Sequence, residues 1–288
     1  MIHVTKKNKS AIQRRLIPTY IFLIIVSFIS VFPLYWMISA ATNTSTDVSR
    51  GRIIPGSHFM ENFRNLTSQQ PLWRALGNSF FYAILTTVIC LLICSIAGYG
   101  FEVYHDKWKD RVFSILLLAM MVPQVATMVP LFKMFSKAGL LNTAVGFILP
   151  IISTPFMIMM FRQNARSFPV DIIEAARIDG LNEVRIFFQM FIPTMKSTYA
   201  AAAVITFMNA WNSYLWPKVI MTDNKAMTMP MLIANLITGY VTDYGMLMCG
   251  VLFCSIPTMI VFFVLQKQFA EGITGCLLYT SPSPRDCS

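Results

Sequence analysis

The sequence predicts an all-α integral membrane protein with six transmembrane helices, and three observations point to this fold class. First, the 288 residues are 56% hydrophobic and only 12% charged, with a mean hydropathy of +0.59. Second, the charged residues lie in clusters between long apolar runs. Third, several of these runs reach about 20 residues, the length that an α-helix needs to cross a bilayer. This composition excludes a soluble enzyme, a secreted disulfide scaffold and a disordered chain.

Six apolar runs are expected to span the membrane. The first, residues 17–40, follows a basic cluster and is longer than the apolar core of a signal peptide, which has about 7 to 15 residues, so we expect a retained helix. The other expected spans are residues 78–101, 112–135, 142–161, 198–220 and 245–266. Prolines remove backbone donors and are expected to bend or interrupt these helices, namely Pro33, Pro123, Pro130, Pro150, Pro155 and Pro217.

The positions of Lys and Arg predict the orientation. Six spans place both termini on one side of the membrane. With both ends and the 102–111 and 162–197 loops in the cytosol, fifteen of the 23 Lys and Arg residues lie inside and eight outside. The positive-inside rule then predicts cytosolic N- and C-termini, at residues 1–16 and 267–275. Because the net charge of +10 comes from residues that flank apolar spans, we expect membrane lipid and no nucleic acid among the partners.

The sequence contains no pattern for catalysis or metal binding. Four cysteines lie in apolar runs, where a thiol behaves as a small hydrophobic group, and the spacing of all six fits neither a disulfide framework nor a zinc site. No Walker A, HExxH or GxSxG string occurs. We therefore expect no enzyme activity, no catalytic residues, no metal and no cofactor in this chain.

The connection between the fourth and fifth expected spans is too long to be a simple connector. It has about 35 residues, whereas packed helices are usually joined by about 2 to 8. Within it, residues 165–197, here called the 165–197 loop, read as two short helices. Pro169 suits a first turn, Gly180 a left-handed C-terminal cap and Asn182 an N-cap, and Pro193 is expected to break the chain before the next span.

The first of these short helices has two small side chains, Ala175 and Ala176. They would let the helix fit closely into a groove of another protein. We expect apolar residues to secure it to the body of the protein, namely Ile178, Val184, Ile186, Phe187 and Phe188. From the residues alone, an interfacial amphipathic helix and a partner-docking element both remain open.

The string EAARIDG, Glu174 to Gly180, followed by Ile192-Pro193, resembles the EAA loop of ABC importer permeases. Residues 120–143, 148–163, 211–217 and 242–250 are similar to the carbohydrate-uptake branch of that superfamily, in its second-permease type. The similarity runs from about residue 14 to about residue 275, and it implies that residues 17–266 form a permease domain of the type I importer fold.

This resemblance implies a permease subunit of a binding-protein-dependent sugar importer, in the cytoplasmic membrane of a bacterium. The implied partners are a homologous second permease, two ATPase subunits that bind ATP and Mg, and an extracytoplasmic sugar-binding protein. It assigns coupling to the ATPase to Glu174, Ala175, Ala176, Asp179 and Gly180. Among substrates, oligosaccharides lead, and glycerol phosphate esters and monosaccharides remain open. A secondary carrier is less favoured, because no charge lies well inside a span.

Candidates for the substrate path cluster inside the fifth expected span, namely Asn209, Asn212, Ser213 and Tyr214. Amides donate and accept hydrogen bonds with hydroxyls, and aromatic faces cover the C–H faces of a sugar ring, as Trp211 and Trp216 also could. The alternative is interhelical hydrogen bonding with an aromatic belt at the interface. Residues 276–288 resemble a translated sequencing adapter, and we expect them to be non-native.

Overall fold

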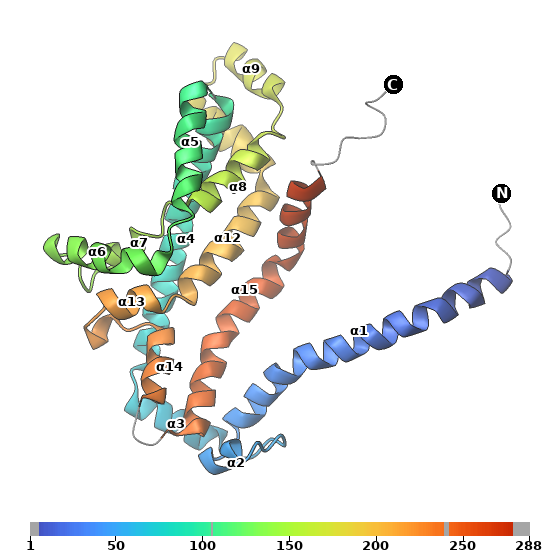
Figure 1. The fold of residues 1–288 in the computed structure, drawn as a ribbon, viewed down its shortest axis with the longest axis vertical. Helices are drawn as coiled ribbons and strands as arrows, with labels where there is room; N and C mark the ends of the chain where they lie inside the picture. Colours follow the sequence, from blue (N-terminus) through green and yellow to red (C-terminus); the bar gives the residue numbers. More distant parts are fainter. Residues whose placement is uncertain (1–5, 105, 239–241, 279–288) are drawn as a thin grey trace. The chain divides into compact units, whose positions relative to one another are not determined.

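The computed structural model describes residues 6–104, 106–238 and 242–278, and side chains only within residues 17–266 (Figure 1). Every regular element in these ranges is a helix, which confirms the all-helical class. Residues 1–5 of the expected cytosolic N-terminus and residues 279–288 of the expected non-native tail lie outside the described residues.

The chain divides into two compact units, residues 1–70 with 235–253 and residues 71–234 with 254–288. The first unit contains α1 (Lys6–Ala41), α2 (Ser45–Ser49), α3 (Phe59–Gln69) and the first turns of α15 (Tyr244–Leu278). The Asn62 amide donates to the carbonyls of Ala41 and Asn43, each at 2.9 Å. These buried hydrogen bonds satisfy the end of α1, so the chain turns there in one defined way.

The second unit is built on α4 (Leu72–Val103), which packs against α8 (Pro155–Ala165) and α12 (Lys196–Trp211) (Figure 1). Close contact with α8 depends on Gly98, because a Cβ there would lie 2.6 Å from the Phe161 Cβ and 2.8 Å from the Arg162 nitrogen. Glycine is the residue that lets two helix backbones approach this closely in a membrane protein.

Three expected spans are continuous helices in the structure. The segments Ile17–Ala41, Leu72–Val103 and Tyr244–Gln266 are the described helices that are long and apolar enough to cross a bilayer. They correspond to the spans expected at residues 17–40, 78–101 and 245–266. Their side chains are largely exposed along the apolar faces, as expected where lipid replaces water.

The other three expected spans are interrupted in the structure, as the prolines within them predicted. Residues 112–135 fall on α5 (Lys107–Ala119) and α6 (Gln124–Lys137), which bend by 100° at the break. Residues 142–161 fall on α7 (Ala144–Ile148) and α8, and residues 198–220 on α12 and α13 (Leu215–Ile220). Pro123 and Pro155 lie at two of the breaks, and Pro217 follows the third, because proline lacks the N–H that would continue each helix.

The 165–197 loop forms α9 (Val170–Ile178), α10 (Glu183–Ile186), the π-helix η1 (Phe187–Phe191) and α11 (Ile192–Thr194). Two helical stretches were predicted, and the second proves to be one run that widens into a π-helix. Pro193 does not end this run as expected. Pro193 lies within α11, and the break comes two residues later, at Met195, just before α12.

Two short helices follow α13, η2 (Asn224–Ala226) and α14 (Met229–Ile237). Asn78 of α4 donates to the carbonyls of Lys225 and Met227, and the Ser79 hydroxyl accepts from the Met229 nitrogen at 2.8 Å. Side chains of α4 therefore hold the start of α14 in place.

Candidate functional site

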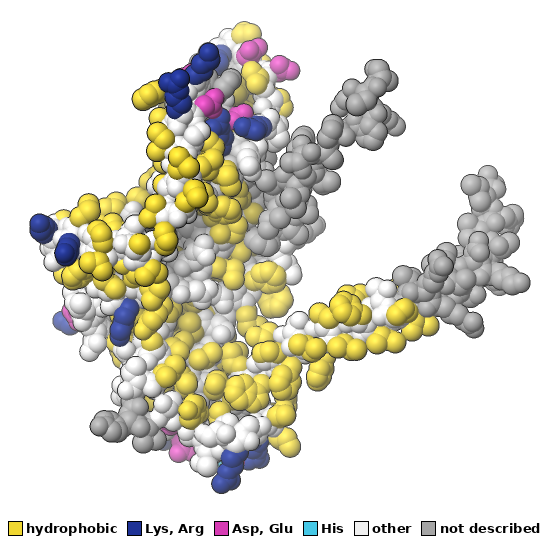
Figure 2. Space-filling view, viewed as in Figure 1, with side chains coloured by type: hydrophobic (Ala, Val, Ile, Leu, Met, Phe, Trp, Pro, Cys, Tyr) yellow, Lys and Arg dark blue, Asp and Glu magenta, His cyan; other side chains and the backbone are white. Residues whose placement is uncertain are grey.

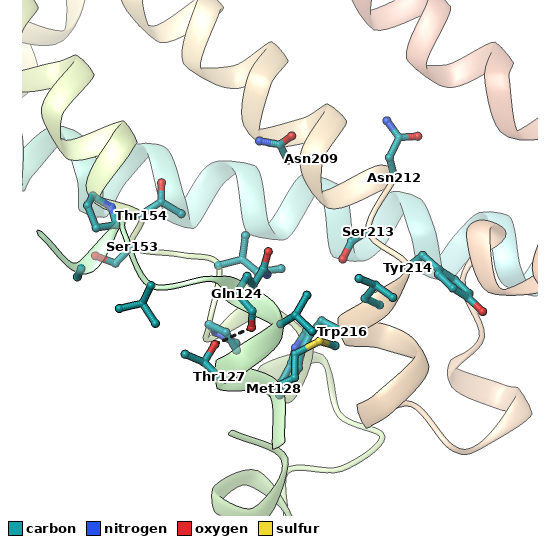
Figure 3. A pocket seen from close by; sticks show the side chains of 17 residues that line it. Gln124, Thr127, Met128, Ser153, Thr154, Asn209, Asn212, Ser213, Tyr214 and Trp216 are labelled. Carbon is teal, nitrogen blue, oxygen red and sulfur yellow. Dashed lines mark hydrogen bonds between the residues drawn. The ribbon is translucent and has the colours of Figure 1, made fainter. Parts of the chain in front are cut away.

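The three helix breaks of the second unit surround one cavity of about 740 Å³ (Figure 3). Its walls come from α6, from the 150–155 stretch that precedes α8, and from the residues between α12 and α13. Interrupted helices expose polar backbone, which a membrane protein tolerates only where it is buried in protein or borders water. The breaks therefore account for a polar cavity in an apolar protein.

All four residues predicted for a substrate path lie in this cavity, namely Asn209, Asn212, Ser213 and Tyr214. Asn209 is in the last turn of α12, and the other three form the break before α13. Among the described residues, the side-chain amides of Asn209 and Asn212 make no hydrogen bond, and both residues are exposed. Their donors and acceptors are open to a ligand.

The two tryptophans of the same segment make hydrogen bonds to other helices, which was the alternative to a role in the substrate path. Trp211 is fully buried, and its Nε1 donates to the Cys254 carbonyl at 3.0 Å. Trp216 borders the cavity, but its Nε1 donates to the Gly146 carbonyl at 3.1 Å. Both indole N–H groups are therefore committed within the protein, and only the ring of Trp216 can face a ligand.

Sequence reasoning missed four polar residues of the cavity wall. Gln124 and Thr127 come from the first turn of α6, and Ser153 and Thr154 immediately precede α8 (Figure 3). A signal for them was present, because each pair follows or precedes a proline inside an apolar run. Polar residues at an interrupted membrane helix usually face the bundle interior or a wet cavity.

The cavity wall mixes polar and apolar side chains and is uncharged. Of the described residues that line it, none is Asp, Glu, Lys, Arg or His. Groups of three or more His, Cys, Asp or Glu that could hold a metal are also absent from the described part of the chain. A neutral ligand with many hydroxyls matches such a lining, because amides and hydroxyls bond it in both directions without the cost of burying a charge.

The predicted C-terminal cap of α9 is confirmed in detail. Gly180 has a φ of +80°, its nitrogen donates to the Arg177 carbonyl at 3.1 Å, and the Leu181 nitrogen donates to the Ala176 carbonyl at 3.0 Å. This pair of bonds is the Schellman motif, which satisfies the last carbonyls of a helix. Glycine suits the position because it adopts the left-handed conformation without steric cost.

The inner face of α9 is held by a cluster that the sequence identified only in part. Ile173 is 2% exposed and packs with Ala176, Ile186 and Phe187, together with residues of α4, α8 and η1. Ile186 and Phe187 therefore anchor the loop as predicted. Ala176 points inward as well, so of the two alanines only Ala175 lies on the exposed face.

Three residues expected to anchor the loop do not. Ile178 is 87% exposed, and Val184 and Phe188 are also exposed. Ile178 lies on the outer side of α9 because the helical period brings Ile173 and Ala176 to the inner face. Glu174 and Asp179 are also exposed. The outer face of α9 is thus apolar in part, with an acidic border.

A polar contact joins α9 to α10 beside the end of α4. The Arg177 Nε donates to Glu183 Oε1 at 2.7 Å, and the Arg177 guanidinium lies 6.0 Å from the centre of the Tyr104 ring. Hydrogen bonds from Arg177 and then from Tyr104 lower the pKa of the Glu183 carboxyl. The same bond to Glu183 raises the pKa of Arg177. Both groups remain charged at neutral pH, so the contact is an ion pair.

Figure 2 shows charged side chains of both signs gathered over the end of the second unit that carries α9, whereas hydrophobic side chains cover most of the helices below. The site residues thus form two groups, one charged at this end and one uncharged in the cavity.

The sequence matches the family model described as binding-protein-dependent transport system inner membrane component, over residues 91–275. The chain belongs to this family. It is therefore the membrane component of an ATP-driven importer, a multi-pass inner membrane protein, and not the ATPase, which in the family is a separate subunit.

Three curated relatives are similar over most of their length. The lactose transport system permease protein LacG of Rhizobium radiobacter is 40% identical, over 92% of this chain and 98% of its own. The arabinooligosaccharides transport system permease protein AraQ of Halalkalibacterium halodurans is 36% identical, over 86% and 91%. The sn-glycerol-3-phosphate transport system permease protein UgpE of Escherichia coli O1:K1 is 31% identical, over 84% and 90%.

The fold is similar to that of a chain in the crystal structure of a bacterial ABC transporter involved in the import of the acidic polysaccharide alginate. The TM-score is 0.79, with 20% sequence identity, over 93% of this chain and all of that chain. This similarity confirms a helical permease fold with several apolar spans.

Proposed function

We propose that this permease carries a neutral carbohydrate, with oligosaccharides as the leading class, and that the cavity holds the sugar during its passage. The observation that carries the proposal is the uncharged polar wall of a cavity of about 740 Å³, in which two asparagine amides have no partner among the described residues. That volume lies within the range of small-molecule sites. The names of the LacG and AraQ relatives support the substrate class.

A glycerol phosphate ester is the second candidate, because the UgpE relative is 31% identical to this chain. The cavity lining suits a phosphate ester less well than a neutral sugar. A phosphate carries about two negative charges and is usually bound by Arg, Lys or helix N-termini, and none of the described lining residues is a cation.

The remaining partners and the topology belong to the same proposal. The chain would pair with a second permease, receive sugar from an extracytoplasmic binding protein and rest on two ATPase subunits. Three continuous helices and three interrupted ones would make six passes with both termini in the cytosol, and the Lys and Arg count supports a cytosolic 165–197 loop.

The outer face of α9 would dock into the ATPase. Ala175 provides a low surface, Ile178 an exposed apolar side chain, and Glu174 and Asp179 acidic groups for pairing with basic residues of the partner. Gly180 and Ala176 would contribute from within, by capping and packing the helix so that it moves as a rigid body.

Uptake by the reconstituted transporter tests the substrate. Proteoliposomes that contain the chain with its partner subunits are supplied with labelled lactose, an arabino-oligosaccharide or glycerol 3-phosphate. We expect uptake of a sugar, and Asn212→Leu should raise the half-saturating sugar concentration about tenfold, the effect of losing one good hydrogen bond. Asn164→Leu, which changes an amide outside the cavity, is the matched control. Uptake of glycerol 3-phosphate alone would refute the carbohydrate proposal.

A further inference from the structure

The second unit contains a buried charge that the proposed substrate path does not use. Arg162 lies near the end of α8, and its side chain is only 8% exposed. Its Nε donates to Glu102 Oε2 of α4 at 3.1 Å, and its terminal nitrogen to Asp110 Oδ1 of α5 at 2.6 Å. The guanidinium carbon lies 4.4 Å from the centre of the Phe113 ring. One side chain of α8 therefore contacts two other helices, α4 and α5.

The surroundings of Arg162 balance its charge. Arg166, 63% exposed, makes a second contact with Glu102 at 3.3 Å, so two arginines face two carboxylates. Burial lowers the pKa of Arg162, but hydrogen bonds from it to Asp110 and Glu102 more than offset this, and the net shift is upward. A planar guanidinium can bond two acceptors at once, which a lysine ammonium does less well.

The same helices connect this contact to the cavity. Residues Thr154 and Pro155, at the start of α8, line the cavity, and Arg162 lies two turns further along the helix. Ala119, at the far end of α5 from Asp110, also lines it. A helix of the length of α8 spans about 16 Å and is stiff over that distance. A displacement of one end of α8 therefore also moves its other end.

Beyond Arg162, α8 reaches the cluster under α9. Ala165 of α8 is 3% exposed and packs with Phe168, Ile173 and Ala176. Arg162 therefore lies between the segment proposed to meet the ATPase and the cavity proposed to hold the sugar. A weak joint there would let α5 slide against α8 when α9 is displaced.

We propose that Arg162 is a positioning residue that clamps the ends of α4, α5 and α8 together, so that a displacement of α9 reaches the cavity wall through α8. The inference rests on the proposed function, since it presupposes an ATPase that moves α9. It assigns Arg162 no contact with the sugar.

Two measurements on the assembled transporter test the clamp. One is the number of ATP molecules hydrolysed per sugar imported. The other is hydrogen–deuterium exchange of residues 150–155 with and without vanadate-trapped nucleotide, which does not depend on the identity of the sugar. In Arg162→Gln we expect the ATP-to-sugar ratio to rise at least about threefold and the nucleotide-dependent change in exchange to fall by at least about half, with the half-saturating sugar concentration unchanged.

Arg166→Gln is the matched control, because it shares Glu102 but is exposed, and it should leave both readouts unchanged. Arg162→Lys should restore coupling in part, because it keeps the charge without the planar fork. An Arg162→Gln transporter with wild-type stoichiometry and a wild-type exchange response would overturn the inference.

Arg162→Gln leaves two carboxylates partly buried and can fail to accumulate for that reason alone. The variant Glu102→Gln, Asp110→Asn, Arg162→Met then removes all three charges together. If this triple variant accumulates and is uncoupled, the clamp is supported; if it is fully coupled, or if neither variant accumulates, the clamp is abandoned. A wild-type transporter whose exchange does not respond to nucleotide refutes the proposed coupling of the ATPase to the cavity through α9, whereas a normal wild type with a normal Arg162→Gln refutes only the clamp.

Discussion

The cavity and the charged end of the second unit use polar residues in opposite ways. At the charged end, Arg162 and Arg177 each bond a carboxylate of the same chain, at 2.6 to 3.1 Å. In the cavity, Asn209 and Asn212 make no hydrogen bond with the described residues. Polar side chains that bond to one another make the structure more rigid. Side chains whose donors and acceptors have no partner can bind a ligand. The difference matches the two proposed roles, transmission of force at the charged end and binding of sugar in the cavity.

Gly98→Val should damage both regions, because α8 carries both. The new side chain would collide with the backbone of α8 at Phe161 and Arg162. Overpacking against backbone should cost more than about 3 kcal/mol, and we expect little folded protein in the membrane. Gly100→Val is the control on the same helix, since a Cβ there meets nothing within 4 Å. Membrane abundance and thermal unfolding in detergent measure the effect, and equal stability of the two variants would contradict the close packing.

Two isoleucines of α9 should separate folding from docking. Ile173→Asp buries an unpaired charge and should destabilise the permease by about 3 kcal/mol. Ile178→Asp changes a side chain that is 87% exposed and should leave thermal stability unchanged, while it weakens the complex with the ATPase. Thermal unfolding and co-purification of the ATPase provide the two readouts. Retention of the ATPase by Ile178→Asp would exclude the outer face of α9 as the docking surface.

Two asparagines should sharpen the contrast further. Asn182 caps α10 by accepting from the Arg185 nitrogen at 2.9 Å, so Asn182→Ala should cost about 1 kcal/mol. Asn209→Ala removes an amide that has no partner among the described residues, so stability should not change while sugar uptake falls. Thermal unfolding and uptake are measured on the same preparations. A loss of stability in Asn209→Ala would mean that the cavity amide has a structural role.

The smallest effect concerns pH. Because the pKa of Glu183 is lowered by Arg177, the pair contributes stability above the ordinary pKa of 4.5, and this contribution is lost as the pH falls below that value towards the lowered one. Glu183 is exposed to screening by solvent, so the loss should be small. Thermal unfolding between pH 7 and about pH 4 should show a slightly smaller decline in Glu183→Gln than in wild type. A steeper decline in the variant would contradict the sign of the pKa shift.

Much of the site could be predicted because its residues lie close together in the sequence. The motif at residues 174–180 and the glycine that caps it are local features, and so is the polar run at residues 209–214. Gln124 and Thr154 also line the cavity but lie far from that run in sequence. Contact between α6 and α13 brings Gln124 to it, and packing of α8 against α4 and α12 brings Thr154. Arg162 was placed in a loop, because its buried position depends on carboxylates 60 and 52 residues away.

The sequence by itself determined that the chain is helical, apolar and membrane-spanning, that prolines interrupt some of its helices, and which short segment carries the family motif. Length, hydropathy, proline and glycine act within a few residues, so these features need no knowledge of distant neighbours. Only the tertiary structure decided that Ala176 faces inward while Ile178 faces outward, that the amides are open while the indoles are bonded, and that Arg162 joins three helices. Burial and hydrogen bonding between distant segments decide such matters, because each depends on which helices lie against one another.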